Sequence, residues 1–407
     1  MKMRRKVIKM KSKSKIIILI ALGNLFALSP MITVNLSFKA GNNNKSSEYS
    51  DDIKILDELN FKLSKISERI HIINNSGWVA FKNAGNCTGE GTYSDPYVIE
   101  DLEINGGGSD FGIWIENSSV YFRIENCSVS YAGAGIQLSK VNNSLIITNN
   151  CSLNYYGIYL LECNNNTISR NTANNNWYGI YLFYSNKNTI SGNTANNNWY
   201  GIYLRESNDN IVSGNTANDN TYSGILISES NNNDISENNA INNRGGIVVG
   251  ILSNDNTISE NNASNNEYGI YLHCNNNTIS GNTANNNDYG IYLEEASDNT
   301  ILRNTVNNNN NGICLEEASD NNNITENIIN YNNLIGIVLD SSNGNIIYFN
   351  CFNNSSMLMM MVRIIIGIME LRGIIGVIIQ AQTQMATGLV MCHIILQVLR
   401  EVKTTFH

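Results

Sequence analysis

Paired carboxylates recur near the end of the repetitive part of the chain. Glu294 and Glu295 are followed one repeat later by Glu316 and Glu317. Paired carboxylates perform glycoside hydrolysis, and carboxylate oxygens are the ligands that Ca²⁺ prefers. Stacked like charges repel each other, so these four side chains are expected either to point into solvent or to hold a calcium ion. The sequence does not distinguish an acid from a base among them.

Aromatic residues occupy two fixed positions in three successive repeats. The first position holds Tyr155, Trp177 and Trp199, and the second holds Tyr159, Tyr181 and Tyr203. A flat apolar ring with a polar tip can stack on a sugar or another planar ligand. Rings stacked on one another also stabilise the outside of a sheet. The pattern therefore predicts an aromatic stripe that binds a ligand, with a purely structural role as the alternative.

Two cysteines occupy corresponding places in neighbouring repeats. Cys127 and Cys151 each directly follow an asparagine of the repeat, which should bring their backbones within reach of a disulfide. An exported protein meets the oxidising conditions that such a bond requires. Cys163, Cys274 and Cys314 have no matching neighbour, and we expect them to pack as small apolar side chains.

A short repeat must position all of these groups. A Gly-apolar-x-apolar element, such as GIYL or GIVV, begins at Gly112 and recurs every 21 to 24 residues until Gly336. An asparagine recurs in step with it, and Ile or Val lies three residues before nearly every one. The recurring asparagines are Asn150, Asn171, Asn193, Asn215, Asn238, Asn261, Asn282, Asn304 and Asn327.

Each repeat contains strands too short to form a stable hairpin, separated by Asn-rich bends that tolerate left-handed backbone. One repeat cannot bury its own apolar side, but identical strands stacked about 4.8 Å apart satisfy one another and place Ile upon Ile. The sequence therefore predicts an all-β fold, a right-handed parallel β-helix of about eleven coils. We expect the recurrent asparagines to form an internal ladder of amide hydrogen bonds, with a row of ligand contacts as the alternative.

Residues 1–40 combine a cluster of Lys and Arg with an apolar run, which is the layout of a signal peptide or an N-terminal membrane anchor. Residues 41–74 are expected to form a linker and an N-terminal cap, and residues 75–355 the β-helix. The formal net charge of -9 argues against a nucleic-acid partner, which a basic surface would favour.

The entry segment GEGTYSDPYVIEDLEINGGG, residues 89–108, and the repeated NTISGNTANNNWYGIYL resemble the NosD-like, carbohydrate-binding and sugar-hydrolase type of β-helix repeat proteins. The resemblance covers about residues 75–350. It implies the pectin lyase-like fold, but this architecture carries lyases, hydrolases, adhesins and metal-delivery proteins alike. Some members are named for periplasmic copper delivery. Copper prefers soft or imidazole ligands, and the repeats contain little His or Met.

The composition changes abruptly after Ser356, from Asn, Gly and Thr to Ile, Met, Val and Arg. Back-translated and read one base earlier, this stretch can encode a string with GNYWSDY and DxNGDG, which resembles the usual ending of the family. We interpret residues 356–407 as a frameshifted tail that replaces the family's C-terminal cap, together with a calcium-binding turn. A β-helix without its cap exposes an open sheet edge.

The sequence as a whole predicts an exported protein at the cell surface with a binding or structural role, whose partner is a glycan or a component of the cell envelope. The near-identity of the central coils favours this role, because an active site normally interrupts a repeat. The alternatives are a polysaccharide lyase or glycoside hydrolase, and a copper-binding protein for metal delivery. No cofactor other than calcium is indicated.

Overall fold

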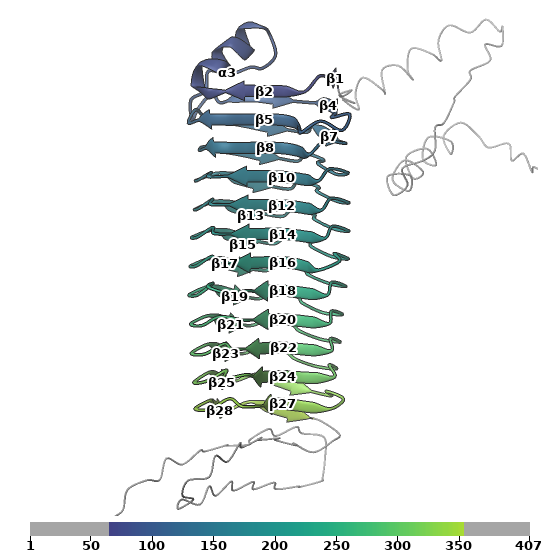
Figure 1. The fold of residues 1–407 in the computed structure, drawn as a ribbon, viewed down its shortest axis with the longest axis vertical. Coiled ribbons are helices and arrows are strands. Elements are labelled where there is room, and N and C mark those ends of the chain that lie inside the picture. Colours follow the sequence, from purple (N-terminus) through teal and green to yellow (C-terminus); the bar gives the residue numbers. More distant parts are fainter. Residues whose placement is uncertain (1–64, 354–407) are drawn as a thin grey trace, which may run out of the picture. The chain divides into compact units, whose positions relative to one another are not determined.

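Short strands, one from each repeat, stack in register into two long parallel sheets (Figure 1). The structure is a computed structural model, and it describes residues 65–353. The first sheet contains β2 (Ile70–Ile73), β5 (Phe111–Ser118), β8 (Ala134–Val141), β10 (Tyr156–Leu161), β12 (Tyr178–Phe183), β14 (Tyr200–Arg205), β16 (Ser223–Ser228), β18 (Gly245–Val249), β20 (Tyr268–Leu272), β22 (Tyr289–Glu294), β24 (Asn311–Glu316) and β27 (Ile335–Leu339).

The second sheet pairs the strands of the facing side in the same order. It contains β3 (Tyr97–Glu100), β6 (Phe122–Glu125), β9 (Ser144–Ile147), β11 (Thr167–Ser169), β13 (Thr189–Ser191), β15 (Ile211–Ser213), β17 (Asp234–Ser236), β19 (Thr257–Ser259), β21 (Thr278–Ser280), β23 (Thr300–Leu302), β25 (Asn323–Thr325) and β28 (Ile346–Tyr348). The fold is therefore the predicted all-β solenoid of about eleven coils.

A third side closes each coil with very short pairings. At its ends lie β1 (Lys65–Ser67), β4 (Leu102–Asn105), β7 (Ser128–Ser130), β26 (Ile328–Asn330) and β29 (Cys351–Asn353). Single-residue parallel bridges, such as Thr172 to Thr194 and Thr194 to Thr216, connect β7 to β26 through every coil between them. Backbone pairing therefore continues along all three sides.

The interior is a set of columns in which like side chains lie on like. Ile168, Ile190 and Val212 face one another in the pairing of β11, β13 and β15, and all three are fully buried. Bends between strands use left-handed backbone, as at Asn175 and Asn197, both with φ of 57°. Asparagine reaches this conformation more easily than most residues, which explains the Asn-rich turns.

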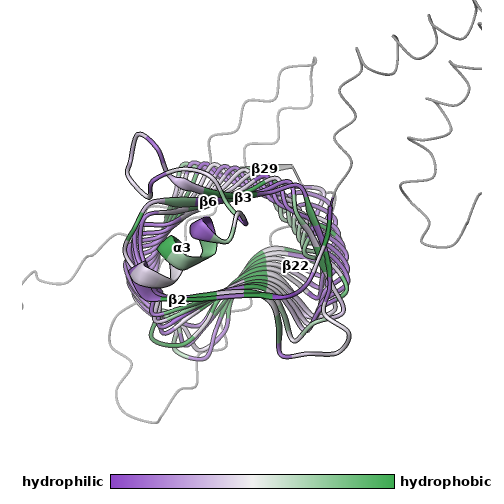
Figure 2. Ribbon diagram, turned by 90° about the horizontal axis from the view of Figure 1, so that it is seen from above, coloured by the Kyte–Doolittle hydropathy of each residue, from purple (hydrophilic) through white to green (hydrophobic). Residues whose placement is uncertain are grey.

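A helix, α3 (Asn74–Asn83), lies over the N-terminal end of the tube (Figure 2). Its Trp78 is fully buried, stacks on Tyr97 at 5.2 Å and donates a hydrogen bond from Nε1 to Ser118 Oγ. This helix begins at the last residue of the segment 41–74, in which the sequence predicted a linker and an N-terminal cap. Strand pairing also begins earlier than predicted, because β1 pairs with β4 from Lys65 onward.

Several predictions fall outside the part of the chain that the structure describes. These are the signal peptide or anchor in residues 1–40, most of the linker, and the frameshifted tail in residues 356–407. Within residues 65–353, no helix has the length and apolar character needed to cross a membrane.

Candidate functional site

The recurrent asparagines lie in one buried column. Nδ2 of Asn171 donates to Oδ1 of Asn193 at 3.0 Å, and the same oxygen accepts the backbone N–H of Asn171 at 2.9 Å. Nδ2 also donates to the carbonyl oxygen of Ile146. The same pattern runs through Asn193, Asn215, Asn238, Asn261, Asn282, Asn304 and Asn327. Because these amides are buried and engaged by the neighbouring coils, they are not ligand contacts.

The predicted rung at Asn150 is wrong. Asn149 occupies the column and donates from Nδ2 to Oδ1 of Asn171, whereas Asn150 is exposed. The spacing from Asn149 to Asn171 is 22 residues, as it is from Asn171 to Asn193. The even spacing was the signal that could have identified Asn149, but the run of consecutive asparagines obscured it.

Two further asparagine columns were missed in the sequence. One begins at Asn166 and continues through Asn188, Asn210, Asn233, Asn256, Asn277, Asn299 and Asn322. The other begins at Asn154 and continues through Asn176, Asn198, Asn220, Asn243, Asn266, Asn287, Asn309 and Asn332. All three columns bind bends to their neighbours, so the asparagines within them are structural.

The expected disulfide is also wrong. Cys127 lies in the asparagine column, where its backbone N–H donates to Oδ1 of Asn149, whereas Cys151 lies in the column of Ala173. The two cysteines therefore belong to different columns, and both thiols are free. Burial raises the pKa of Cys127 to about 11 and that of Cys163 to about 12. These thiols are protonated at neutral pH.

The two aromatic positions differ in exposure. Tyr155, Trp177 and Trp199 are 41%, 43% and 38% exposed, and the indole rings of Trp177 and Trp199 stack at 3.9 Å. In the second position, Tyr181 is only 7% exposed, because Tyr159 and Tyr203 stack on its two sides. We call Tyr155, Trp177 and Trp199 the aromatic row, and it is the accessible part of the predicted stripe.

A third set of rings, which the sequence analysis missed, fills the space between the two predicted positions. Tyr156, Tyr178 and Tyr200 begin β10, β12 and β14, and they stack at 5.1 and 5.4 Å. Burial raises the pKa of Tyr156 to about 12. These rings pack against the second position, so the inner part of the stripe stabilises the sheet surface.

The paired glutamates do lie in adjacent coils, but their carboxylates are engaged by different partners. Glu294 pairs in register with Glu316. The hydroxyl of Tyr271 donates to Glu294, and the hydroxyl of Tyr292 donates to Glu316 at 2.9 Å. Burial and the contact with Glu294 raise the pKa of Tyr271 above its ordinary range.

Glu295 and Glu317, the second residues of the two pairs, have different surroundings. Glu295 lies 3.3 Å from Nε2 of His273, and Glu317 is exposed. No group of three or more His, Cys, Asp or Glu side chains in residues 65–353 is arranged to hold a metal ion. The predicted calcium site at Glu294, Glu295, Glu316 and Glu317 is therefore not formed by these carboxylates.

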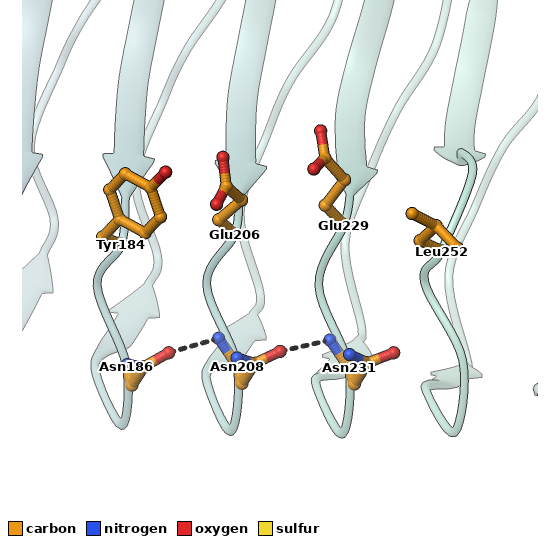
Figure 3. A pocket seen from close by; sticks show the side chains of 7 residues that line it. All are labelled: Tyr184, Asn186, Glu206, Asn208, Glu229, Asn231 and Leu252. Carbon is orange, nitrogen blue, oxygen red and sulfur yellow. Dashed lines mark hydrogen bonds between the residues drawn. The ribbon is translucent and has the colours of Figure 1, made fainter.

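An open depression of about 430 Å³ lies just beyond the ends of β12, β14, β16 and β18 (Figure 3). Tyr184, Glu206, Glu229 and Leu252 form one row across four coils, and Asn186, Asn208 and Asn231 form a parallel row. The sequence analysis missed this site, because its residues share a position in the coil but not a residue type.

The geometry of the depression follows from its turns. The four residues of the first row all have left-handed backbone, with φ of 51°, 49°, 53° and 55°, and this conformation places them at the same point of each bend. In the second row, Oδ1 of Asn186 accepts the backbone N–H of Asn208, and Oδ1 of Asn208 accepts that of Asn231. These bonds hold the second row in register.

Sequence comparison identifies a family for this solenoid. The profile described as "Periplasmic copper-binding protein (NosD)" matches residues 100–262 and 250–362. The chain belongs to the NosD family. No curated protein matches it in sequence.

Solved structures with a similar fold are distant in sequence. The A-module of mannuronan C-5 epimerase AlgE4 from Azotobacter vinelandii is 16% identical, with a TM-score of 0.48 over 69% of this chain and 92% of that one. The periplasmic alginate epimerase AlgG is 16% identical, with a TM-score of 0.45 over 72% and 85%. The Dettilon tailspike protein is 16% identical, with a TM-score of 0.49 over 72% and 62%. This level of likeness concerns the β-helix and says nothing about activity.

Residues 65–353 do not fit the copper ion in the family's description. Copper requires imidazole, thiolate or thioether ligands, and several of these together. His71 and His273 lie in coils far apart along the axis, and each contacts a glutamate. The buried thiols of Cys127 and Cys163 are held protonated.

Proposed function

We propose that this NosD-family protein is an exported, non-catalytic β-helix that binds a glycan through the aromatic row. One observation carries the proposal: Tyr155, Trp177 and Trp199 are large, exposed rings in three successive coils. Exposed aromatic groups that gather on one surface mark an interaction site. Because the rings stack on one another, a sugar would contact their exposed apolar edges, and the Tyr hydroxyl and Trp N–H offer hydrogen bonds.

The arrangement of the row suits a chain-like ligand. Tyr155 and Trp177 stack at 5.3 Å, and Trp177 and Trp199 stack at 3.9 Å. The rings therefore form one continuous apolar strip that follows the axis of the solenoid. Because coils repeat about every 4.8 Å, successive sugar units of an extended chain meet successive rings. The rings are held by stacking on one another, so binding costs little conformational entropy.

The case against catalysis rests on the carboxylates. A glycoside hydrolase requires one carboxylic acid and one carboxylate on opposite sides of the scissile bond. Glu294 and Glu316 instead lie on one face in adjacent coils, each accepting a hydrogen bond from a tyrosine. They also lie several coils away from the aromatic row.

Export is supported by two features. The first residues carry the basic and apolar layout of a secretory signal, and the family is described as periplasmic. A location outside the cytoplasm would give the aromatic row access to envelope glycans.

A glycan array probed with the full chain tests the proposal. The double variant Trp177→Ala/Trp199→Ala is expected to lose at least one group of glycan signals that the native chain gives. Tyr93→Ala, which removes an exposed ring near the N-terminal cap, should retain them. Equal binding by native chain and double variant would contradict the role of the row.

An assay for reducing ends and unsaturated products on the bound glycans tests the non-catalytic part. Binding without product formation is the expected outcome. Product formation that disappears in Glu294→Gln/Glu316→Gln would contradict it and would establish an enzyme.

A further inference from the structure

The depression beyond β12, β14, β16 and β18 is separate from the aromatic row. The row directly precedes β10, β12 and β14, whereas Tyr184 and Glu206 directly follow β12 and β14. A strand of six residues spans roughly 20 Å, so one sugar unit cannot contact both. The two surfaces therefore lie at opposite ends of the same strands.

The lining of the depression is suited to hydroxyl groups. Each of two adjacent coils contributes a carboxylate and an amide, Glu206 with Asn208 and Glu229 with Asn231. A carboxylate accepts hydrogen bonds only, whereas the amide Nδ2 donates them. Neighbouring hydroxyls of a sugar both donate and accept, so each coil can satisfy one diol.

The row is closed at both ends by side chains without charge. Tyr184 and Leu252 are 46% and 67% exposed, and they stand at the first and last of the four coils. Four coils separated by about 4.8 Å give a length of roughly 14 Å. This length accommodates about three sugar units in an extended chain, one for each coil step.

The charge of the depression selects against acidic ligands. Nε of Arg205 lies 3.8 Å from carboxylate oxygens of both Glu206 and Glu229. One positive charge therefore offsets only one of these two negative charges. The neighbouring Glu206 carboxylate also raises the Tyr184 pKa. In residues 65–353, acidic side chains outnumber basic ones more than twofold. A polyuronate or sulfated chain would meet repulsion both locally and from the whole surface.

We infer that this depression is a second binding site, which takes an uncharged, hydroxyl-rich chain of about three sugar units laid along the solenoid axis with one unit per step between coils. The Glu206 and Glu229 carboxylates and the Asn208 and Asn231 amides bind the hydroxyls. Tyr184 and Leu252 bound the site. The inference goes beyond the aromatic row, because it rests on different residues at the other end of the strands.

Calorimetric titration of the full chain with neutral gluco- and manno-oligosaccharides of two to six units, and with oligouronates of the same lengths, tests the inference. Affinity for a neutral series should rise up to about three units and then level off, and the oligouronates should bind at least tenfold more weakly. Absence of binding by both neutral series, or preference for oligouronates, would overturn it.

Paired variants separate hydrogen bonding from charge. Glu206→Ala/Glu229→Ala should weaken binding of the neutral trisaccharide at least tenfold. Glu206→Gln/Glu229→Gln keeps polar groups and removes the charge, so it should reduce the discrimination against oligouronates. The matched control is Glu237→Gln/Glu260→Gln, because these glutamates also occupy left-handed turns in adjacent coils but lie outside the depression.

The two sites can fail independently. If Trp177→Ala/Trp199→Ala abolishes all binding and Glu206→Ala/Glu229→Ala changes none, the second site is disproved and the aromatic row stands. If the trisaccharide binds with native affinity when the row is removed, and the glutamate variant abolishes this binding, the second site is established separately from the row.

Discussion

The buried columns and the exposed rows of the same coils follow opposite rules. In β10, β12 and β14 the buried Ile158, Ile180 and Ile202 are identical and face one another in register. At the turn that follows each strand, the exposed residue changes from tyrosine after β12 to glutamate after β14 and β16, and to leucine after β18. Stacking requires repetition only where side chains are enclosed between coils. The outer turns are free to vary, and the groups of the depression lie there, whereas the exposed aromatic row still repeats at Trp177 and Trp199.

The shortest coil shows the same division. Asn256 and its successor Asn277 are 21 residues apart, whereas neighbouring rungs are 22 or 23 apart. The serine column also changes there, from Ser253 to Cys274 and Ala296. The asparagine columns nevertheless continue unbroken through this coil. Residues are therefore removed from the outer bend, and the buried bonds are kept.

Alkaline pH should have the largest effect, because it acts on buried thiols and half-buried tyrosines in several coils at once. Burial raises the pKa of Cys163 to about 12 and that of Tyr156 to about 12, whereas unfolded Cys and Tyr titrate near about 8.5 and 10. The unfolded chain loses protons first, so the stability present below about pH 8.5 decreases as the pH rises to 12.

The melting temperature measured by circular dichroism from pH 7 to pH 12 checks this dependence. Cys163→Ser is the control, because Ser185 occupies the next position of the same column, and this variant should show a smaller decrease. A melting temperature that stays constant up to pH 12 would contradict the protonated interior.

Gly179→Ala should destabilise the protein by roughly 3 kcal/mol through overpacking. A Cβ at this position would lie 2.5 Å from the carbonyl oxygen of Gly201 and 2.9 Å from Nδ2 of Asn198. Gly214→Ala is the matched comparison, since no atom lies within 4 Å of its Cβ and only the left-handed φ of 64° opposes the change. It should cost about 1 kcal/mol. Urea unfolding measures the destabilisation by each substitution. Equal destabilisation would show that Gly179 does not lie close to Gly201 of the next coil.

Asn215→Leu should destabilise the protein by roughly 1–3 kcal/mol, because buried partners in both adjacent coils each lose a hydrogen bond. The partners are Asn193, which donates to Oδ1 of Asn215, and Asn238, which accepts from its Nδ2. The exposed Asn310→Leu should change stability by less than about 0.5 kcal/mol. Urea unfolding of both variants tests this prediction. An unchanged unfolding midpoint for Asn215→Leu would exclude the asparagine column as a source of stability.

Trp199→Ala should have the smallest effect on stability, about 1 kcal/mol from the lost ring stack. The ring of Trp199 is 38% exposed and stacks on Trp177 outside the core. Differential scanning calorimetry beside a glycan-binding assay checks both effects. A loss of stability larger than that of Asn215→Leu would mean that the row belongs to the structural part of the molecule.

The prediction of the fold and of part of the site rested on periodicity. The recurring Ile and Gly predicted stacked coils, and eight of the nine proposed asparagines lie in one column. Asn150 was misplaced because consecutive asparagines give several equivalent registers, and only the backbone pairing of the coils selects Asn149. Cys127 and Cys151 were matched by the same error, so the disulfide was predicted across two columns.

The sequence by itself determined the parallel solenoid and the identity of its buried residues, because backbone pairing and burial repeat with the period of the chain. The tertiary structure alone decided which aromatic rings are accessible and brought Tyr184, Glu206, Glu229 and Leu252 into one row. Exposure at a turn depends on how the bends of neighbouring coils lie over one another. A row of unlike residues leaves no repeating pattern in the sequence, since only their left-handed backbone aligns them in space.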